Sequence, residues 1–542
     1  MIINRSFKDF KFRHRSKKNQ IIFTKKKVKN DEEVLNLIDN FLDEKNSFIF
    51  ESVEKGKIKG RYTIFGKNPD KIWEFNNNNS YLIQKNKKRK LNDKPDKLIE
   101  KNSFIFESVE KGKIKGRYTI FGKNPDKIWE FNNNNSYLIQ TNKKRKLNDK
   151  PDKLIEKIIE DFKFETPKNL PNICSLISGY FSYDSIRYIE KIPNNCKNDL
   201  NLPDVRLLRP RTLVIHDNLK KEIFYISNIF KDEKIKNYKN KYEEVKSDLF
   251  KLLIQSSIKN IDKKIIQKSK NIKVKSNTSK NKFLSMVNKA KKYIKLGDIF
   301  QVVLSQRFEA KLTKKPLDIY KKLRVTNPSP FMFFFNFEDF QIIGASPEIL
   351  VRLRDNKITV RPIAGTRPRG KTKKEDLFYE RDLLKDKKEL SEHLMLLDLG
   401  RNDAGKVSKI NSVKVTESFI IERYSHVMHI VSNVVGEYNK KFSKFKSLLA
   451  GFPAGTVSGA PKIRAMEIID ELETTKRKVY AGGIGYFSAN GEFDTCIALR
   501  TAIAKKDKFY VQAGAGIVAD SIPKKEYDET VNKAKALINA LK

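Results

Sequence analysis

The chain has 542 residues, with 112 Lys and Arg against 66 Asp and Glu, so its formal net charge is +46. This length predicts a few domains, each large enough to bury its own hydrophobic core. The 36 Phe and 19 Tyr argue against intrinsic disorder, while three Cys without a C-x-x-C pair exclude a disulfide scaffold and disfavour a zinc site.

The high positive charge has two interpretations. A large positive field attracts polyanions, as in nucleic-acid-binding proteins. The Lys residues are, however, scattered rather than gathered into one basic stripe with aromatic residues between them, so we expect no nucleic-acid partner. Charge begins at Arg5 and no 18 apolar residues run together, so we expect a cytoplasmic protein without a signal peptide or membrane span.

A long internal repeat lies in the first third of the chain. Residues 45–100 recur as 101–156, and the two copies differ only in Lys85 against Thr141. Solenoid repeats diverge in detail and need three or more copies, so this pair indicates a tandem duplication or an error of sequence assembly. We expect one copy to be surplus to the fold. Each copy has short, Gly-punctuated apolar runs, which predict strands and hairpins.

The region after the repeat predicts the end of one domain and the start of another. Short apolar runs at 186–189 and 213–215 predict strands. The Lys-rich stretch 231–280 predicts a charged helix and a linker. We therefore expect an N-terminal domain over 1–270 and a C-terminal domain over 271–542.

A strong amphipathic helix opens the second domain. Its apolar stripe at helical spacing consists of Phe283, Met286, Val287, Ala290, Tyr293 and Ile294. Gly297 is the expected C-terminal cap. Beyond it, strands and helices mix without a regular βαβ rhythm, which favours an α+β fold over a doubly wound sheet.

Two predicted helices each carry a Glu pair with a spacing of three residues. Glu389 and Glu392 lie in the helix-like run 375–399, and Glu526 and Glu529 lie in a predicted last helix. Residues three apart share a helix face, so two such helices can offer carboxylate oxygens to Mg²⁺. The same spacing is ordinary for exposed helix surface, and both interpretations stand.

Three further segments contain candidate binding or catalytic residues. Gly514 and Gly516 allow backbone N–H groups to approach an anion closely. Arg500, in an expected apolar strand, is costly to bury unless it meets a carboxylate, either of a ligand or of a structural salt bridge. His429 lies in a strand-like apolar run, which suits a core histidine as well as a catalytic one.

Five motifs together resemble the chorismate-utilising enzyme family, and within it the anthranilate synthase large subunits. The matching segments are 344–348, 362–370, 389–395, 458–462 and 512–516. The resemblance covers essentially the whole chain, counting one repeat copy. It implies an α+β fold of large antiparallel sheets packed face to face and flanked by helices. It also implies a Mg²⁺-dependent lyase that converts chorismate and ammonia to anthranilate and pyruvate through an aminodeoxyisochorismate intermediate, the first step of tryptophan biosynthesis.

The resemblance also assigns the site residues. It places Mg²⁺ at Glu392 and Glu529, with Glu389 and Glu526 in the surroundings of the metal. The expected substrate-binding residues are Gly365, Thr366, Tyr480, Arg500, Gly514, Ala515, Gly516 and Lys533.

Two catalytic roles follow in the same way. Glu348 matches the carboxylate proposed to protonate the departing C4 hydroxyl, a role that requires a pKa raised by burial. His429 matches the residue needed for the later elimination of pyruvate.

Two positions indicate which member of the family the chain resembles. Ala364 stands where para-aminobenzoate-pathway synthases carry a nucleophilic Lys. Gln301 stands where isochorismate and salicylate synthases use a Lys to activate water, and Gln cannot act as that base. Both positions favour ammonia as the nucleophile and anthranilate as the product.

The family takes its ammonia from a glutamine amidotransferase. None of the three Cys lies in the G-x-C-x-G elbow of such a domain, so we expect a separate amidotransferase subunit and a hetero-oligomer. Family members are inhibited by tryptophan in the N-terminal domain. The matching tryptophan-binding residues are Ser52 or Ser108, Pro330, Phe331 and Met332. The near-identity of the copies leaves the choice between Ser52 and Ser108 open.

Two alternatives remain at this point. One is another chorismate enzyme, such as an aminodeoxychorismate synthase, which differs in its product. The other is a basic protein that binds anions or nucleic acid on an inactive enzyme scaffold.

Overall fold

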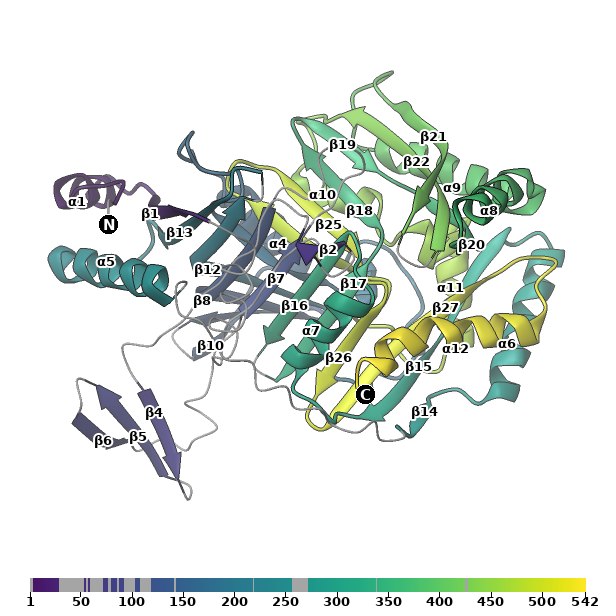
Figure 1. Cartoon of the computed structure of the whole chain (residues 1–542), viewed down its shortest axis with the longest axis horizontal. Helices are drawn as coiled ribbons and strands as arrows, with labels where there is room; N and C mark the ends of the chain where they lie inside the picture. The colour runs from purple at the N-terminus through teal and green to yellow at the C-terminus, as the bar shows by residue number, and fades with distance from the viewer. Residues whose placement is uncertain are drawn as a thin grey trace.

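A computed structural model of the chain describes residues 3–28, 118–140, 143–217, 219–255, 272–337, 339–424 and 427–542, with short strands between residues 53 and 107. Every ladder between strands in this part of the chain is antiparallel, and helices are interspersed among the strands (Figure 1). The α+β class and the large antiparallel sheets are therefore confirmed. None of the helices described is long and apolar enough to cross a membrane.

The helices have the following bounds: α1 Phe7–Arg15, α4 Pro151–Asp161, α5 Tyr238–Gln255, α6 Lys280–Lys295, α7 Pro316–Thr326, α8 Lys373–Lys385, α9 Lys387–Gly405, α10 Lys444–Ala450, α11 Lys462–Leu472 and α12 Pro523–Asn539. Two short 3-10 helices are η1 Tyr183–Tyr188 and η2 Gly455–Val457. The strands before residue 270 are β1 Gln20–Lys27, β2 Val53–Glu54, β3 Lys57–Ile58, β4 Ile72–Asn76, β5 Asn79–Gln84, β6 Lys87–Leu91, β7 Ser103–Glu107, β8 Tyr118–Asn132, β9 Asn135–Gln140, β10 Lys143–Leu147, β11 Leu176–Phe181, β12 Val205–Asp217 and β13 Glu222–Ile229.

The strands after residue 270 are β14 Val274–Ser276, β15 Gln301–Lys311, β16 Phe331–Phe337, β17 Phe340–Ser346, β18 Ile349–Arg354, β19 Lys357–Val360, β20 Ile363–Pro368, β21 Lys414–Arg423, β22 Val427–Glu437, β23 Gly459–Ala460, β24 Gly483–Ser488, β25 Phe493–Ile497, β26 Thr501–Lys505 and β27 Lys508–Ile517.

Strand β12 joins two series of strands because it changes partners along its length. Its first half lies between β8 and β11, and its second half lies between β8 and β13. The register shifts between Arg209 and Pro210. Proline has no N–H for a ladder and is tolerated at such irregularities, so Pro210 lies where the strand can bend.

The two series end at the strands that carry the predicted site residues. One series runs from β8 through β7, β16, β17 and β26 to β27 and β15. The other runs from β11 through β24, β25, β18 and β19 to β22, which also pairs with β20 and β21. Helix α12 packs on β27 and α9 packs on β20 and β22 (Figure 1).

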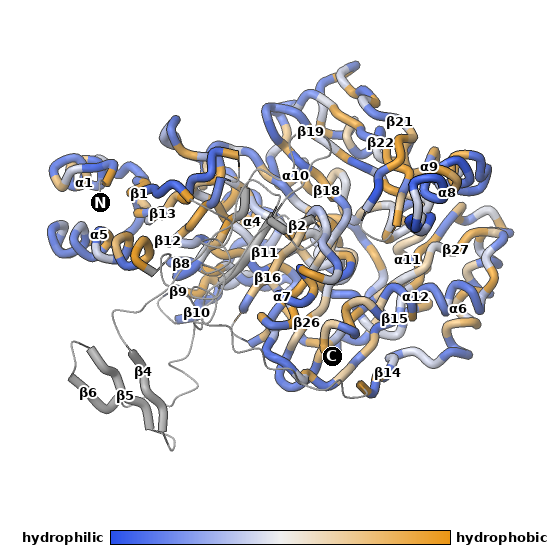
Figure 2. Tube along the Cα trace, in the orientation of Figure 1, coloured by the Kyte–Doolittle hydropathy of each residue, from blue (hydrophilic) through white to orange (hydrophobic). Residues whose placement is uncertain are grey.

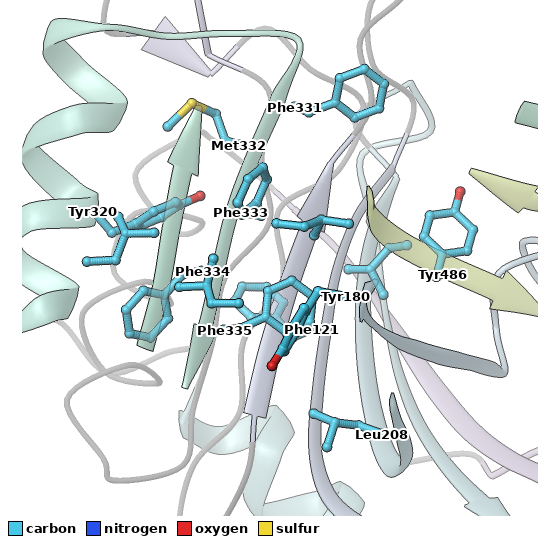
Figure 3. Close-up of a cluster of buried hydrophobic side chains, with 14 of the residues drawn as sticks. Phe121, Tyr180, Leu208, Tyr320, Phe331, Met332, Phe333, Phe334, Phe335 and Tyr486 are labelled. Atoms are coloured by element: carbon cyan, nitrogen blue, oxygen red, sulfur yellow. The ribbon is translucent and has the colours of Figure 1, made fainter. Parts of the chain in front are cut away.

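The core around β16 shows how an apolar strand can be buried on both faces. Met332 and Phe334 point toward Tyr320 of α7, whereas Phe333 and Phe335 point to the opposite side (Figure 3). This is the alternation that a pleated strand imposes. Figure 2 shows mostly hydrophilic residues along the outer helices α1 and α8, as expected for elements that face water on one side.

Most of the predicted elements after residue 270 are present. The apolar stripe of α6 is buried, Ser279 caps the start of the helix, and Gly297 follows its end with φ of +84°. Helix α12 begins at Pro523, as predicted. The run 375–399 is wrong as a single helix, because Asp386 ends α8 and its side chain accepts hydrogen bonds from the first N–H groups of α9.

The N-terminal predictions are mixed. Residues 213–215 lie in β12, but 186–189 do not form a strand, because this segment falls in η1 and at its end. The charged helix within 231–280 is α5. The division into 1–270 and 271–542 stays a prediction, since 256–271 lie outside the described residues.

The structure places the second repeat copy in the large sheet. Strands β7 to β10, all from residues 101–156, pair with one another or with β12 and β16. The first copy forms β4, β5 and β6, a separate three-stranded sheet in the same register: Ile72 pairs with Ile83 as Ile128 pairs with Ile139. The shared register shows that the two copies have the same local preference for forming these paired strands.

Helix α4 explains why the second copy is favoured. It begins in the repeat at Pro151 and continues past its last residue, Glu156, to Asp161. Ile155 and Ile159 are both buried on its apolar face. After the first copy the chain reads Lys-Asn-Ser-Phe where α4 has Lys-Ile-Ile-Glu, so Ile159 would be replaced by Ser103.

Candidate active site

His429 on β22 faces a turn formed by Gly365 and Thr366 on β20. Its Nδ1 lies 2.9 Å from the carbonyl oxygen of Gly365 and 3.0 Å from the Thr366 hydroxyl. A carbonyl oxygen only accepts hydrogen bonds, so Nδ1 carries the proton and Nε2 is the acceptor nitrogen. Burial lowers the pKa of His429 to about 4, so the ring is neutral at pH 7 and can accept a proton.

Glu389 lies against the same turn. A Cβ at Gly365 would lie 3.3 Å from Oε2 of Glu389, and the φ of +69° at Gly365 favours glycine. Arg367 donates to Oε1 of Glu389 at 3.3 Å. Burial and the nearby Glu392 raise the pKa of Glu389, whereas Arg367 opposes that rise. The charge of Glu389 therefore depends on the charges that Glu392 and Arg367 carry beside it.

Gln301, Glu392 and Gly516 form a tightly packed group between β15, α9 and β27. The amide Nε2 of Gln301 donates to Oε1 of Glu392 at 3.1 Å. A Cβ at Gly516 would lie 2.6 Å from that nitrogen and 3.9 Å from the Glu392 oxygen. A side chain at 516 would therefore displace the amide of Gln301 from its place beside Glu392. The Oε1 of Gln301 is buried and accepts no hydrogen bond from the described residues, so an acceptor is left for a ligand.

Lys533 connects α12 to the other glycine of β27. Its ammonium group donates to the carbonyl oxygen of Gly514 at 3.0 Å and lies 2.6 Å from Oε1 of Glu529. A Cβ at Gly514 would lie 2.7 Å from the hydroxyl of Tyr480, so glycine is needed here too. Glu529 and Lys533 are both about half exposed, so this part of the site is open to water.

Side chains at the starts of α9 and α12 interact across the site. Burial and Glu529 raise the pKa of Glu526, while Lys388 of α9 and Lys533 lower it. A Cβ at Gly516 would lie 3.9 Å from the carboxylate of Glu392. Glu529 is linked to Gly514 because the ammonium group of Lys533 contacts both. These glycines are two residues apart on one strand, a rise of about 7 Å. The acidic faces of the two helices therefore border the same short stretch of β27.

The carboxylates of α9 and α12 are candidate ligands for a divalent cation. No group of three or more His, Cys, Asp or Glu ligands occurs among the residues described. Mg²⁺ commonly takes only one or two protein carboxylates and fills its other positions with water and substrate. Glu392 and Glu529 supply two carboxylates, and Glu389 and Glu526 have pKa values raised partly by their acidic neighbours. This donor chemistry fits Mg²⁺.

Arg500 lies in the loop just before β26, not inside a strand as predicted, and its φ is +46°. Burial lowers the pKa of its guanidinium, and Tyr424 opposes that effect. Its guanidinium forms no hydrogen bond or ion pair with any residue in the described part of the chain. Of the two alternatives that the sequence left open, a structural salt bridge is therefore not found there, and the guanidinium is available to an anionic ligand.

Glu348 lies in the loop before β18 and is 5% exposed. Thr456 donates to its Oε1 at 3.0 Å. Burial raises the pKa of Glu348 to about 8, opposed by the hydrogen bonds from Thr456 and the backbone of Ile363. The carboxyl group is therefore protonated at pH 7, as a general acid requires.

The remaining predicted residues fall into two groups. Ala515 is buried with its side chain on the face of β27 opposite Gly514 and Gly516, so only its backbone can face the site. Phe331 and Met332 are buried in the core, and they point to different sides of β16 (Figure 3). Pro330 precedes this strand. Ser52 and Ser108 lie outside the described residues.

Two residues near the site were not predicted from the sequence. Arg367 pairs with Asp382, Asp386 and Glu389, and so ties the β20 turn to α8 and α9. Thr456 orients Glu348. The contacts of Arg367 have a sequence signal, which is an Arg in a Gly/Pro-rich turn before two acidic helices. The contact of Thr456 has none, because nothing in the local sequence links it to Glu348, which is 108 residues away.

Comparisons with known proteins agree with this geometry. Residues 102–539 match the sequence profile of the family described as chorismate binding enzyme. The chain is 49% identical over 447 residues to anthranilate synthase component 1 of Cereibacter sphaeroides, covering 81% of this chain and 89% of that protein. It is 46% identical over 452 residues to the protein of the same name from Acetivibrio thermocellus, covering 82% and 91%.

Solved structures show the same fold. The crystal structure of anthranilate synthase component I from Streptococcus pneumoniae superposes with a TM-score of 0.70 at 39% identity, covering 79% of this chain and 94% of that chain. The menaquinone-specific isochorismate synthase MenF from Escherichia coli superposes with a TM-score of 0.60 at 16% identity, covering 94% and 100%. At that identity the second likeness shows the fold alone.

Proposed function

The chain belongs to the chorismate binding enzyme family, in its anthranilate synthase component 1 branch, and on this premise we propose that it converts chorismate and ammonia to anthranilate and pyruvate. The observation that carries this proposal is the guanidinium of Arg500, which lies near His429 and forms no ion pair with an anionic group in the described chain. Chorismate is a small cyclic dicarboxylate, and an Arg fork binds a carboxylate through two N–H groups.

The proposed substrate site has a cationic end and a glycine-lined side. Arg500 binds one carboxylate, with the Tyr480 hydroxyl beside Gly514. Gly514 and Gly516 let the ring approach the backbone of β27, because a side chain at either position would collide with Tyr480 or Gln301. Lys533 adds a second positive charge at the open edge.

Mg²⁺ is the proposed cofactor, held by Glu392 of α9 and Glu529 of α12. Glu389 and Glu526 supply further negative charge next to these two ligands. When bound, the cation neutralises the second carboxylate of chorismate and draws electrons from the ring. Gln301 keeps the Glu392 carboxylate oriented through its 3.1 Å hydrogen bond.

Two groups of the chain are suited to the proton transfers. The neutral carboxyl of Glu348 donates its proton to the departing hydroxyl, which leaves as water. The neutral His429 then accepts a proton at Nε2 while its Nδ1–H stays bound to Gly365, which supports pyruvate loss and aromatisation.

The choice of nucleophile is proposed from Gln301 and Ala364. The Oε1 of Gln301 is buried without a donor from the described chain and can accept a hydrogen bond from ammonia. Ala364 offers no amine that could attack the ring. A glutamine amidotransferase subunit is the proposed source of ammonia, and tryptophan is the proposed inhibitor, as the resemblance implies.

The test is product identification. Purified chain with chorismate, ammonium and Mg²⁺ is expected to produce anthranilate, identified by chromatography, mass and blue fluorescence, together with one pyruvate per anthranilate. Isochorismate or aminodeoxychorismate as the main product would overturn the choice of nucleophile. Unchanged chorismate would overturn the proposed activity.

A further inference from the structure

A small cavity lies beside Glu348, and neither His429 nor the glycine of the β20 turn lines it. Its volume is about 30 Å³, and its walls come from β18, β19, α9 and the loop before η2. The polar groups that line it are Glu348, Thr456, Arg361 and Asp403. A cavity needs about 10–15 Å³ of space measured in this way, and two to four polar partners, to hold one water molecule. The cavity therefore has the size and the partners for one water.

The charges around the cavity favour water over an ion. Asp403 is paired with Lys462 at 2.9 Å and with Lys406 at 3.1 Å. Arg361 is paired with Glu417 at 2.8 Å and with Glu422 at 2.9 Å. Both charged residues that line the cavity are thus already compensated, and an added ion would find no free counter-charge.

Glu348 has a need that such a water would meet. Its carboxyl is almost fully buried, and Thr456 occupies one of its oxygens. A general acid must recover one proton in every turnover, and a carboxyl that is only 5% exposed has little direct contact with bulk solvent while product fills the site. Arg361 and Leu399 line the cavity and are only partly buried, so a water at this place lies between Glu348 and residues that reach the protein surface.

We infer that this cavity holds a water molecule that returns a proton to Glu348 after each turnover. The inference rests on the proposed function, in which Glu348 is the general acid. The O–H bond of Glu348 breaks as the departing hydroxyl gains that proton and leaves as water. The resulting carboxylate takes a proton from the cavity water, and bulk water replaces that proton along the same path. No atom changes oxidation state in the return step.

Gly400 on α9 allows a direct test. A Cβ at Gly400 would lie 3.6 Å from Val360 and 3.7 Å from Pro362, both of which line the cavity, so a methyl group fits without collision. Gly400→Ala is expected to displace the water and leave the substrate side unchanged. Gly405→Ala is the matched control, because its Cβ would meet nothing within 4 Å on the same helix.

The prediction separates two kinetic constants. Proton return follows the first irreversible step, so Gly400→Ala should lower kcat about tenfold, raise its solvent deuterium isotope effect, and leave kcat/KM for chorismate unchanged. Gly405→Ala should match the wild type in all three. Wild-type kcat and isotope effect in folded Gly400→Ala would overturn the inference.

A high-resolution crystal structure of the wild-type chain gives a second, independent test. We expect one ordered water within hydrogen-bond distance of Glu348 in this cavity, and an empty cavity would overturn the inference even if Gly400→Ala failed to fold. The proposed function fails separately, if the wild type makes no anthranilate from chorismate and ammonium.

Discussion

The site has two walls that carry the same chemical group in different environments. Glu348, on what we call the sealed wall, is 5% exposed in the loop before β18, and burial raises its pKa to about 8. On the open wall, Glu529 is about half exposed and lies 2.6 Å from Lys533, and Glu389 has Arg367 beside it. Environment therefore separates a buried carboxyl group suited to donating a proton from carboxyl groups that have basic side chains beside them.

The largest effect is expected when the open wall loses a proposed metal ligand. Glu392→Gln keeps the shape but removes the charge, which should lower kcat about 1,000-fold or more, since metal stabilisation is worth several kcal/mol. The dependence of the rate on Mg²⁺ concentration should disappear as well. Asp398→Asn, an exposed carboxylate on the same helix, is the control and should leave both unchanged. Normal Mg²⁺ dependence in Glu392→Gln would remove this wall from the mechanism.

The sealed wall should show a different signature. Glu348→Gln cannot donate a proton, so kcat should fall about 100- to 1,000-fold while the Mg²⁺ dependence is preserved. In the wild type, kcat should fall as pH rises through about 8, where Glu348 ionises, and the variant should lack this limb. An alkaline limb that persists in Glu348→Gln would assign the titration to another group.

A smaller effect is expected at Glu389, which belongs to the open wall but is not a proposed ligand. Glu389→Gln should weaken Mg²⁺ binding about 10- to 100-fold, as for residues that adjoin metal ligands. Saturating Mg²⁺ should restore most of kcat, which separates this residue from Glu392. A kcat loss that Mg²⁺ cannot restore would make Glu389 a ligand itself.

The last prediction concerns stability and not the reaction rate. Glu348 has a pKa of about 8 when folded against an ordinary value of 4.5, so its stabilising contribution is fully present below pH 4.5 and is lost as pH rises to about 8. The slope from this one group is at most about 1.4 kcal/mol per pH unit. The free energy of unfolding, measured with denaturant at pH 5 and pH 8, should change less with pH in Glu348→Gln than in the wild type. Equal slopes would mean that Glu348 is ionised in the folded protein.

The sequence predicted elements well where the signal was local. The stripe from Phe283 to Ile294 gave α6, and Pro523 marked the start of α12. The break at Asp386 was missed because the apolar and charged residues on either side read as one helix. The cap is visible only in the contact of its side chain with the N–H groups of Lys388 and Glu389.

Long-range features could not be predicted from local patterns. The two copies of the repeat are equal in local preference, and the choice between them depends on α4, where Ile159 lies beyond the repeat. The environment of Glu348 depends in the same way on Thr456 and on the packing of α9. Motif resemblance proposed the residue, but only the fold shows its burial, its partner and the cavity behind it.

The central claim is that the acidic faces of α9 and α12 hold one divalent cation. The most direct test is a crystal structure of the chain soaked with Mn²⁺ in place of Mg²⁺, read by anomalous scattering. A single Mn²⁺ peak is expected within coordination distance of Glu392 and Glu529. A peak at other residues, or no peak at a Mn²⁺ concentration that supports activity, would contradict it.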